Sequence, residues 1–174
     1  SSRVVSLVSL RENEHAPVYV ENLPTYSNLV GYLEYQELHG ALATNHTLIR
    51  PGALHKANGG YLVIQASDIL SQPAAWHSLK TALRHREVRM EQLRDEGRPR
   101  LAGTVKPLPV PLQVKVIVVG SEEIYYLLHN HDEEFNRLFK VKADFSTSMA
   151  RTEPNLLSMA RSLGQISQEE GLLH

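Results

Sequence analysis

Residues 59–70 read GGYLVIQASDIL, and this stretch decides the fold that the sequence predicts. Its residues 61–64 form a continuous apolar run, which is typical of a strand buried on both faces of a sheet. Residues 114–119, VKVIVV, form a second run of this kind. Strands buried on both faces belong to parallel sheets, and helices connect such strands. We therefore predict an α/β domain with a parallel sheet flanked by helices.

The segments around these two runs supply the helices and further strands. Residues 74–85 have an apolar stripe at helical spacing, with Trp76 on it, and predict an amphipathic helix whose tryptophan lies in the core. Ser121 follows the second run and is suited to cap a helix. The remaining patterns predict strands over 3–10 and 17–20, a short helix over 50–58, a helix passing into a strand over 135–145 and a helix over 155–170, whereas 22–40 show no clear period.

Residues 87–106 predict a β-hairpin, with the sequence DEG at residues 95–97 in its turn. Three arginines flank this turn, at positions 94, 98 and 100, and acidic residues are interleaved with them. Such a group could contact nucleic acid or a neighbouring subunit. The mixed charges favour a solvated hairpin tip.

Composition excludes several classes of function. The chain has 174 residues, of which 42% are hydrophobic and 21% charged, and these values suit a globular domain with a core. Its net charge of −1 creates no basic field that would attract nucleic acid. It has no cysteine, which excludes disulfides and fits a cytoplasmic protein. No apolar run is long enough to cross a membrane.

Five sequence blocks occur in a fixed order and cover nearly the whole chain. They are NLPTYSNLVGYLEY, TLIRPGALHKANGGYLVI, WHSLKTALRHREVRME, PLPVPLQVKVIVVG and EEFNRLFKVKADF. In this order they resemble the AAA domain of Lon-related bacterial proteases. The resemblance implies a P-loop-NTPase-like AAA+ core over residues 1–148, with the hairpin as an insertion, and the start of a helical lid over residues 149–174. The wider clade, which includes magnesium chelatases and minichromosome-maintenance helicases, has a similar layout.

The resemblance places Gln65 and Ala66 where a Walker B strand ends. In active AAA+ ATPases an aspartate there positions Mg²⁺, and the glutamate that follows polarises the attacking water. Gln65 gives a cation no charge, and Ala66 offers no polar group. Asp68 lies two positions past the glutamate position, and we expect it to point elsewhere. The resemblance therefore implies a degenerate Walker B motif with weak or absent ATP hydrolysis.

Two further positions match nucleotide-related sites of the family. Ser121 stands at the sensor 1 position, although a helix cap explains it as well. Arg137 matches the arginine finger that would reach a neighbouring subunit's nucleotide. A surface arginine paired with Glu133 or Glu134 is the alternative interpretation of Arg137.

Tyr32 and Tyr35 lie in a segment that matches a pore-facing insertion, where they would contact threaded polypeptide. Because they are three residues apart, packing on one helix face is the alternative that we favour. His129 and His131, with Asp132, could suggest a metal site, but the spacing is loose and a loop after a helix explains them better.

Two expected features of such a protease do not occur in the sequence. There is no GxxxxGK[ST] loop and no Lon-type serine–lysine segment. ATP and Mg²⁺ are cofactors of the intact family, and we expect this chain not to hold them by itself. In this fold the strand that leads into the phosphate loop lies between the last strand and the sensor 1 strand. We expect that slot to be empty, which invites pairing with another chain or a rearranged sheet. A complete five-stranded sheet in its normal order would contradict this placement.

The resemblance implies a fragment of a cytoplasmic Lon-like ATP-dependent serine protease. This module would handle unfolded polypeptide and assemble a homo-oligomeric ring, a hexamer in the intact protein, without membrane or nucleic-acid partners. The alternative is an AAA+ remodeller or helicase-like module without proteolysis, and a weaker one is a plain interaction domain. The sequence on either side of the chain would distinguish the first two, since a serine–lysine domain belongs only to the protease.

Overall fold

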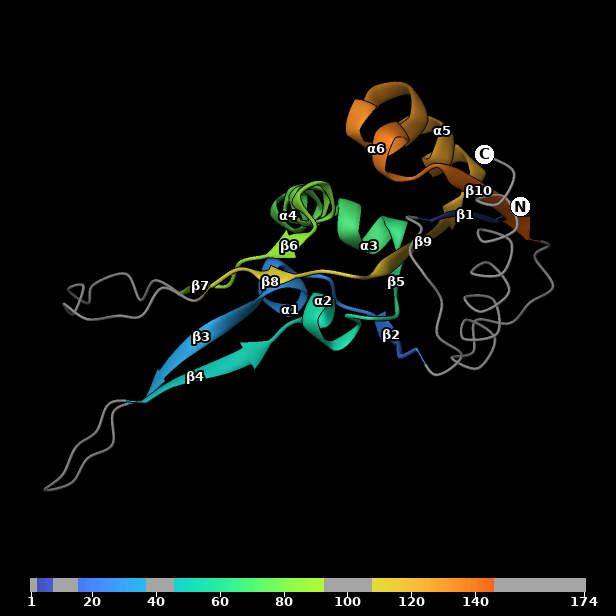
Figure 1. Ribbon diagram of the computed structural model, residues 1–174. Helices are drawn as coiled ribbons and strands as arrows, with labels where there is room; N and C mark the ends of the chain where they lie inside the picture. Colours follow the sequence, from blue (N-terminus) through green and yellow to red (C-terminus); the bar gives the residue numbers. More distant parts are fainter. Residues whose placement is uncertain (1–2, 8–15, 37–45, 93–107, 146–174) are drawn as a thin grey trace, which may run out of the picture.

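The computed structural model describes residues 3–7, 16–36, 46–92 and 108–145 of the chain. Figure 1 shows their arrangement. The strands are β1 (Arg3–Leu7), β2 (Val18–Glu21), β3 (Gly31–Gln36), β4 (His46–Pro51), β5 (Tyr61–Gln65), β6 (Glu87–Val88), β7 (Glu91–Gln92), β8 (Val110–Pro111), β9 (Lys115–Ser121) and β10 (Val141–Phe145). The helices are α1 (Tyr26–Val30), α2 (Ala53–Lys56), α3 (Ala66–Leu70), α4 (Pro73–His85), α5 (Glu122–His131) and α6 (Glu133–Leu138).

The two apolar runs form the centre of the main sheet. β5 and β9 pair in parallel, and β2 extends the parallel arrangement on the other side of β5. Along β5, Leu62 and Ile64 enter one core cluster, which contains buried residues from all six helices. Tyr61 and Val63 enter a second cluster on the opposite face. The predicted α/β class, with parallel strands flanked by helices, is therefore confirmed.

The slot that we expected to be empty is occupied. The main sheet has the order β10-β1-β9-β5-β2, and β1 lies between β9 and β10. β1 runs antiparallel to both neighbours, so it satisfies the facing edges of two strands that run in the same direction. Leu7 pairs with Ile117 near the start of β9, and β2 begins opposite Tyr61 at the start of β5. The reversed direction thus places the end of β1 and the start of β2 at the same end of the sheet.

The second sheet has three strands, and two of them, β3 and β4, form a ribbon that projects from the domain (Figure 1). Its order is β4-β3-β7, and β3 and β4 are antiparallel. At the end of the ribbon nearest α1 and α2, Gly31 and Gly52 let two backbone segments approach closely. A Cβ at Gly31 would lie 2.5 Å from the carbonyl oxygen of Arg50, and a Cβ at Gly52 would lie 2.4 Å from the carbonyl oxygen of Leu29. Only glycine permits this approach of two backbones.

The ribbon corrects two sequence expectations. Residues 22–40 show no clear period in the sequence, but they contain α1 and β3. The sequence did not reveal α1 because a five-residue helix is too short to show a helical repeat. The helix predicted over 50–58 is shorter and spans Ala53–Lys56, since Arg50 and Pro51 pair with β3 instead. Cross-strand pairing outweighed local helix signals at these two positions.

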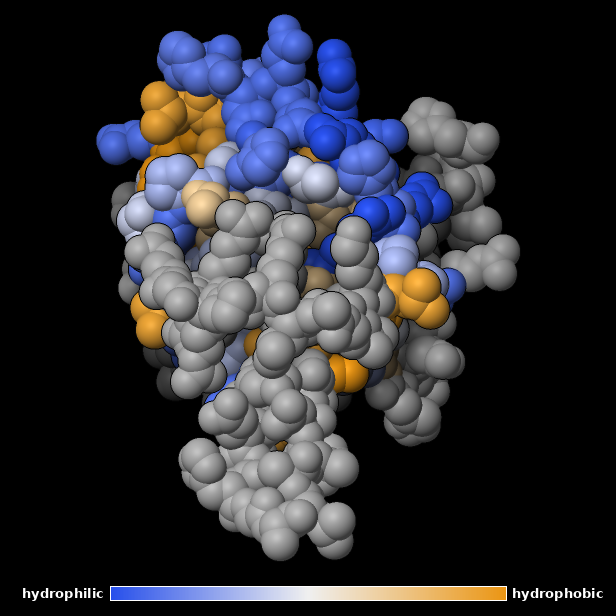
Figure 2. Space-filling model, turned by 90° about the vertical axis from the view of Figure 1, so that its left-hand side faces the viewer, coloured by the Kyte–Doolittle hydropathy of each residue, from blue (hydrophilic) through white to orange (hydrophobic). Residues whose placement is uncertain are grey.

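The predicted hairpin is described only at its root, where β6 and β8 pair antiparallel. Residues 93–107, which include its predicted turn, and residues 149–174, the predicted lid, lie outside the described residues. Within the described part of the chain, no helix is long and apolar enough to span a membrane. In Figure 2, hydrophilic residues dominate the upper part of the face shown, and hydrophobic ones form small separate groups.

Candidate functional site

The candidate site lies where β5 and β9 end side by side. The two strands are parallel, with Gln65 opposite Val119, so their carboxyl ends meet at one edge of the sheet. Gln65 is the last residue of β5 and is half-buried. Its side chain does not cap α3, the helix that begins at the next residue. The strand end that the sequence predicted is therefore confirmed, and it offers an amide at this edge.

The sequence placed Ala66 together with Gln65 at the end of the strand. In the structure Ala66 is instead the first residue of α3. Its side chain is 2% exposed. It packs closely on β9, since a Cβ built on Gly120 would lie 2.9 Å from the Cβ of Ala66. A larger side chain at position 66 must displace these neighbours or turn out of the contact. Ala66 therefore differs from a catalytic glutamate in two ways: it has no charge, and its tightly packed surroundings leave little space for a longer side chain.

Ser121 caps α5, as one of its two interpretations predicted. Its Oγ accepts a hydrogen bond from the backbone N–H of Ile124 at 3.3 Å. Glu122 and Glu123 occupy the first turn of α5, where the positive end of the helix dipole favours them. The cap occupies one acceptor site of the hydroxyl, and the hydroxyl proton stays available to a further acceptor. A sensor role for Ser121 therefore stays a prediction.

Arg137 lies in the last turn of α6 and its side chain is 76% exposed. Its guanidinium is 3.8 Å from the carboxylate of Glu133, one turn earlier. This contact matches the surface-pair interpretation, and an exposed pair of this kind contributes little to stability. Its other predicted partner, Glu134, contacts Arg84 and Lys80 on α4 instead. The arginine therefore faces solvent and is free to meet an anion, and its finger role stays a prediction.

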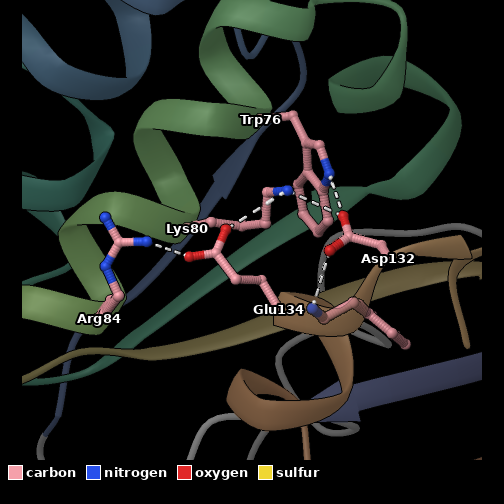
Figure 3. A network of polar contacts seen from close by, with 6 residues as sticks. Trp76, Lys80, Arg84, Asp132 and Glu134 are labelled. Atoms are coloured by element: carbon pink, nitrogen blue, oxygen red, sulfur yellow. Dashed lines mark hydrogen bonds and ion pairs between the residues drawn. The ribbon is translucent and has the colours of Figure 1, made fainter.

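A polar network between α4 and the start of α6 is the feature that sequence reasoning missed (Figure 3). Asp132 accepts hydrogen bonds through Oδ2 from Trp76 Nε1 at 3.0 Å and from Lys80 Nζ at 2.9 Å. Its Oδ1 accepts from the backbone N–H of Phe135 at 3.1 Å and so caps α6. One carboxylate thus joins two helices and begins one of them.

Glu134 extends this network along α4. Its carboxylate pairs with Arg84 and lies 3.7 Å from Lys80 Nζ. Beneath these charges Trp76 stacks on Phe139, and Phe135 stacks on Phe139 with ring centroids 5.1 Å apart. The network therefore covers an aromatic contact that fixes α6 against α4.

The charge state of Asp132 follows from these contacts. Burial by itself raises the pKa of the carboxyl. The hydrogen bonds from Lys80, from the Phe135 N–H and from Trp76, together with the charge of Lys80, outweigh burial and hold the pKa below its ordinary value. Asp132 is therefore ionised at neutral pH.

Two signals in the sequence could have identified this network. Asp132 precedes two glutamates and a phenylalanine, which is a helix start signal. Trp76, Lys80 and Arg84 are spaced by four residues, so they lie along one side of α4. What the sequence could not show is that these two segments, about fifty residues apart, lie against each other.

The sequence favoured a loop for His129 and His131, and this prediction is wrong, because both residues lie in a helix. His129 and His131 belong to the last turn of α5. The ring of His129 stacks on Tyr125, with centroids 5.8 Å apart. Within the described ranges, no three histidine, aspartate or glutamate side chains are grouped as a metal site requires.

The two candidate pore tyrosines lie on β3, so packing on one helix face is wrong for them. Residues three apart on a strand fall on opposite faces, because the side-chain period is two. Tyr32 is half-buried, and the side chain of Tyr35 lies outside the described residues. The two positions therefore cannot form a single aromatic patch on one face of the ribbon.

Comparisons with known proteins define the class of this domain. The profile of a family described as LonB-like, AAA domain matches residues 14–146. The chain therefore belongs to the LonB-like AAA domain family.

Individual similar proteins match smaller parts of this chain than the family profile does. A putative Lon protease homolog of Escherichia coli (strain K12) is 33% identical over 113 residues, which are 63% of this chain and 19% of that protein. The chain thus spans only 19% of the length of this curated relative. Among solved structures, NtrX from Brucella abortus is similar over 72% of this chain and 26% of its own, with 17% identity and a TM-score of 0.46.

Proposed function

We propose that this chain is the AAA+ module of a cytoplasmic Lon-like ATP-dependent serine protease. In this proposal the module handles unfolded polypeptide and contributes to a homo-oligomeric ring, a hexamer in the intact protein, with weak or absent ATP hydrolysis at its own Walker B position. Family membership and the similarity to a putative Lon protease homolog support the protease context. Residues 149–174 would begin the helical lid.

The observation that carries the proposal is the pair Gln65 and Ala66 at the end of β5. Mg²⁺ prefers anionic oxygen ligands, and hydrolysis needs a base or a group that orients water. Gln65 supplies a neutral amide, and Ala66 supplies a buried methyl group packed toward Gly120. These two residues do not fit a Mg²⁺–ATP centre. Ser121 and Arg137 keep the polarity and exposure that nucleotide contacts in the intact protein would need, but at Gln65 and Ala66 the site fits weak or absent hydrolysis.

The test is Mg²⁺-dependent release of phosphate from ATP by the full-length protein. We expect background turnover for the wild type and for Gln65→Asn, which keeps the amide. Any gain should require a carboxylate, in Gln65→Asp or in Gln65→Asp/Ala66→Glu. Because Ala66 is buried, the folding of each variant is checked by circular dichroism. Robust wild-type turnover, comparable to that of active AAA+ ATPases, contradicts the proposal.

A second measurement separates the protease from a remodeller without proteolysis. The full-length protein is incubated with reduced, carboxymethylated α-lactalbumin, which cannot fold, and its fragments are followed by mass spectrometry. Cleavage supports the protease. Absent cleavage, combined with DNA binding that weakens steeply with salt, favours the helicase-like alternative. Sedimentation of the same preparation reports the size of the ring.

A further inference from the structure

The outer strand of the ribbon presents an unused backbone edge. In the sheet order β4-β3-β7, β4 is a terminal strand, and among the described residues no strand pairs with its outer side. In an antiparallel pair only alternate residues direct their N–H and C=O groups toward the partner strand. The other residues of β4 therefore direct these groups away from β3. Such an edge is a template for one more strand.

Two neighbouring side chains of this edge are apolar and exposed. Ile49 is 63% exposed and Leu48 is 36% exposed, and as neighbours on a strand they lie on opposite faces of the ribbon. Natural edge strands usually carry charges that prevent pairing. Over residues 31–36 and 46–51 the only Asp, Glu, Lys or Arg side chains are Glu34 and Arg50. These two pair with each other at 2.6 Å, so Glu34 on β3 balances the charge that Arg50 places on β4.

The edge is also held in a fixed shape before any partner arrives. Leu33, opposite Ile49 in the register, is buried, and at this position β3 also pairs with β7 on its other side. Gly31 and Gly52 bring the root of the ribbon into backbone contact. A rigid edge loses little conformational entropy of its own when a partner strand binds.

We propose that the outer edge of β4 binds an extended, uncharged, apolar segment of unfolded polypeptide by strand addition. Main-chain hydrogen bonds to β4 would supply the affinity, and Leu48 and Ile49 would contact alternate side chains of the segment. This inference rests on the proposed function, since it states how that function takes its substrate. It assigns the contact to β4, and not to Tyr32 and Tyr35 of β3.

An unfolded segment fits this edge better than a second copy of the chain. Pairing of two β4 strands would involve six residues from each copy. A stable dimer buries about 800 Å² from each partner. Six residues of a ribbon that stands away from the domain fall well short of that area. A peptide that is bound and released needs no such area.

The experiment measures binding of a defined peptide to the intact protein by fluorescence anisotropy. The probe is a fluorescein-labelled heptapeptide of alternating valine and threonine, with its carboxyl end amidated. A second probe has the same side chains but is N-methylated at its three central residues, which removes donors on both edges. We expect the N-methylated peptide to bind at least about tenfold more weakly. Equal affinity for both peptides overturns strand addition.

Variants locate the site. Ile49→Lys puts a charge on the edge, and we expect it to weaken binding of the first peptide about tenfold. Leu108→Lys is the matched control, because Leu108 is 85% exposed and lies outside the ribbon. Its affinity should equal that of the wild type. Equal losses in both variants, or none in Ile49→Lys, overturn the inference. So does concentration-dependent dimerisation that disappears in Ile49→Lys, because a second copy then occupies the edge.

Failure of this inference is distinguishable from failure of the proposed function. If the intact protein degrades carboxymethylated α-lactalbumin equally well with and without Ile49→Lys, the function stands and the binding mode is wrong. If the peptide requires Ile49 but the protein cleaves nothing, the edge binds peptide and the protease proposal is wrong.

Discussion

At the scale of single residues, the candidate nucleotide position and the contact between α4 and α6 differ in charge. Gln65 and Ala66 give no charge at the edge of the sheet where β5 and β9 end. The ionised group that organises this half of the domain is Asp132, which three donors hold between α4 and α6. The main electrostatic contribution of these residues is therefore structural, and the predictions at this scale concern stability.

Asp132→Asn should destabilise the domain at neutral pH by about 1–3 kcal/mol, because charge-assisted hydrogen bonds are lost while asparagine still caps α6. The folded-state pKa of Asp132 is depressed. Its contribution is therefore present above the unfolded pKa of about 3.9 and is lost as pH falls through the folded pKa. Urea unfolding at several pH values tests this. A difference between wild type and variant that does not shrink as pH falls below about 3.9 contradicts it.

His55 should make the domain sensitive to mild acid. Both of its ring nitrogens are enclosed and have no hydrogen-bond partner among the described residues, and burial lowers its pKa. The folded state thus favours the neutral ring. Its contribution is full above the unfolded pKa of about 6.5 and declines as pH falls below that value. In His55→Leu, the midpoint of urea unfolding should change less between pH 7.5 and pH 5 than in wild type. His77→Gln, an exposed position on α4, should behave like wild type.

At the scale of secondary structure, the ends of the elements depend on local chemistry that the sequence displays. Ser121 was recognisable as an end signal, and the structure shows it capping α5. The glycines at 59 and 60 were expected to stop α2, but the helix already ends at Lys56, with Ala57 as its C-cap. The end of α4 is different. Arg86 occupies its C-cap with φ of 55°, a conformation in which glycine is favoured. The strain at this position could not be read from the residue alone.

Arg86→Gly should stabilise the domain by roughly 0.5–1 kcal/mol, because glycine removes the steric cost of the left-handed conformation. Arg86→Ala keeps a Cβ and should bring no such gain. Urea unfolding at pH 7 compares the two variants with wild type. Equal stability of the glycine and alanine variants shows that backbone strain at this helix end is negligible.

At the scale of the whole molecule, the main sheet depends on β1. This strand is the one connection between β10 and the rest of the sheet among the described pairings. It also makes the sheet mixed, where the family resemblance implied parallel strands. The antiparallel β1 makes this a rearranged sheet, which is one of the two outcomes that we expected from an empty slot.

Val5→Pro should therefore loosen both neighbours of β1. Val5 lies opposite Val119 of β9 and Ala143 of β10, and proline removes the N–H that bonds one of these neighbours and distorts β1, on which both ladders depend. We expect faster hydrogen exchange of the amides of β10, with a smaller increase in β9, which also pairs with β5. Val5→Thr, which keeps β-propensity and the N–H, is the control. Unchanged exchange in β10 would show that β1 does not hold it.

Local residue patterns were enough to predict the α/β class, the two central strands, helix α4 and the uncharged end of β5, because apolar periodicity and end signals lie within one segment. The direction of β1, the contact of Ala66 with Gly120, and the contacts of Trp76 and Lys80 with Asp132 became known from the folded molecule alone. Each of these depends on segments far apart in the chain, and residue patterns within one segment carry no information on which distant segment will lie against it.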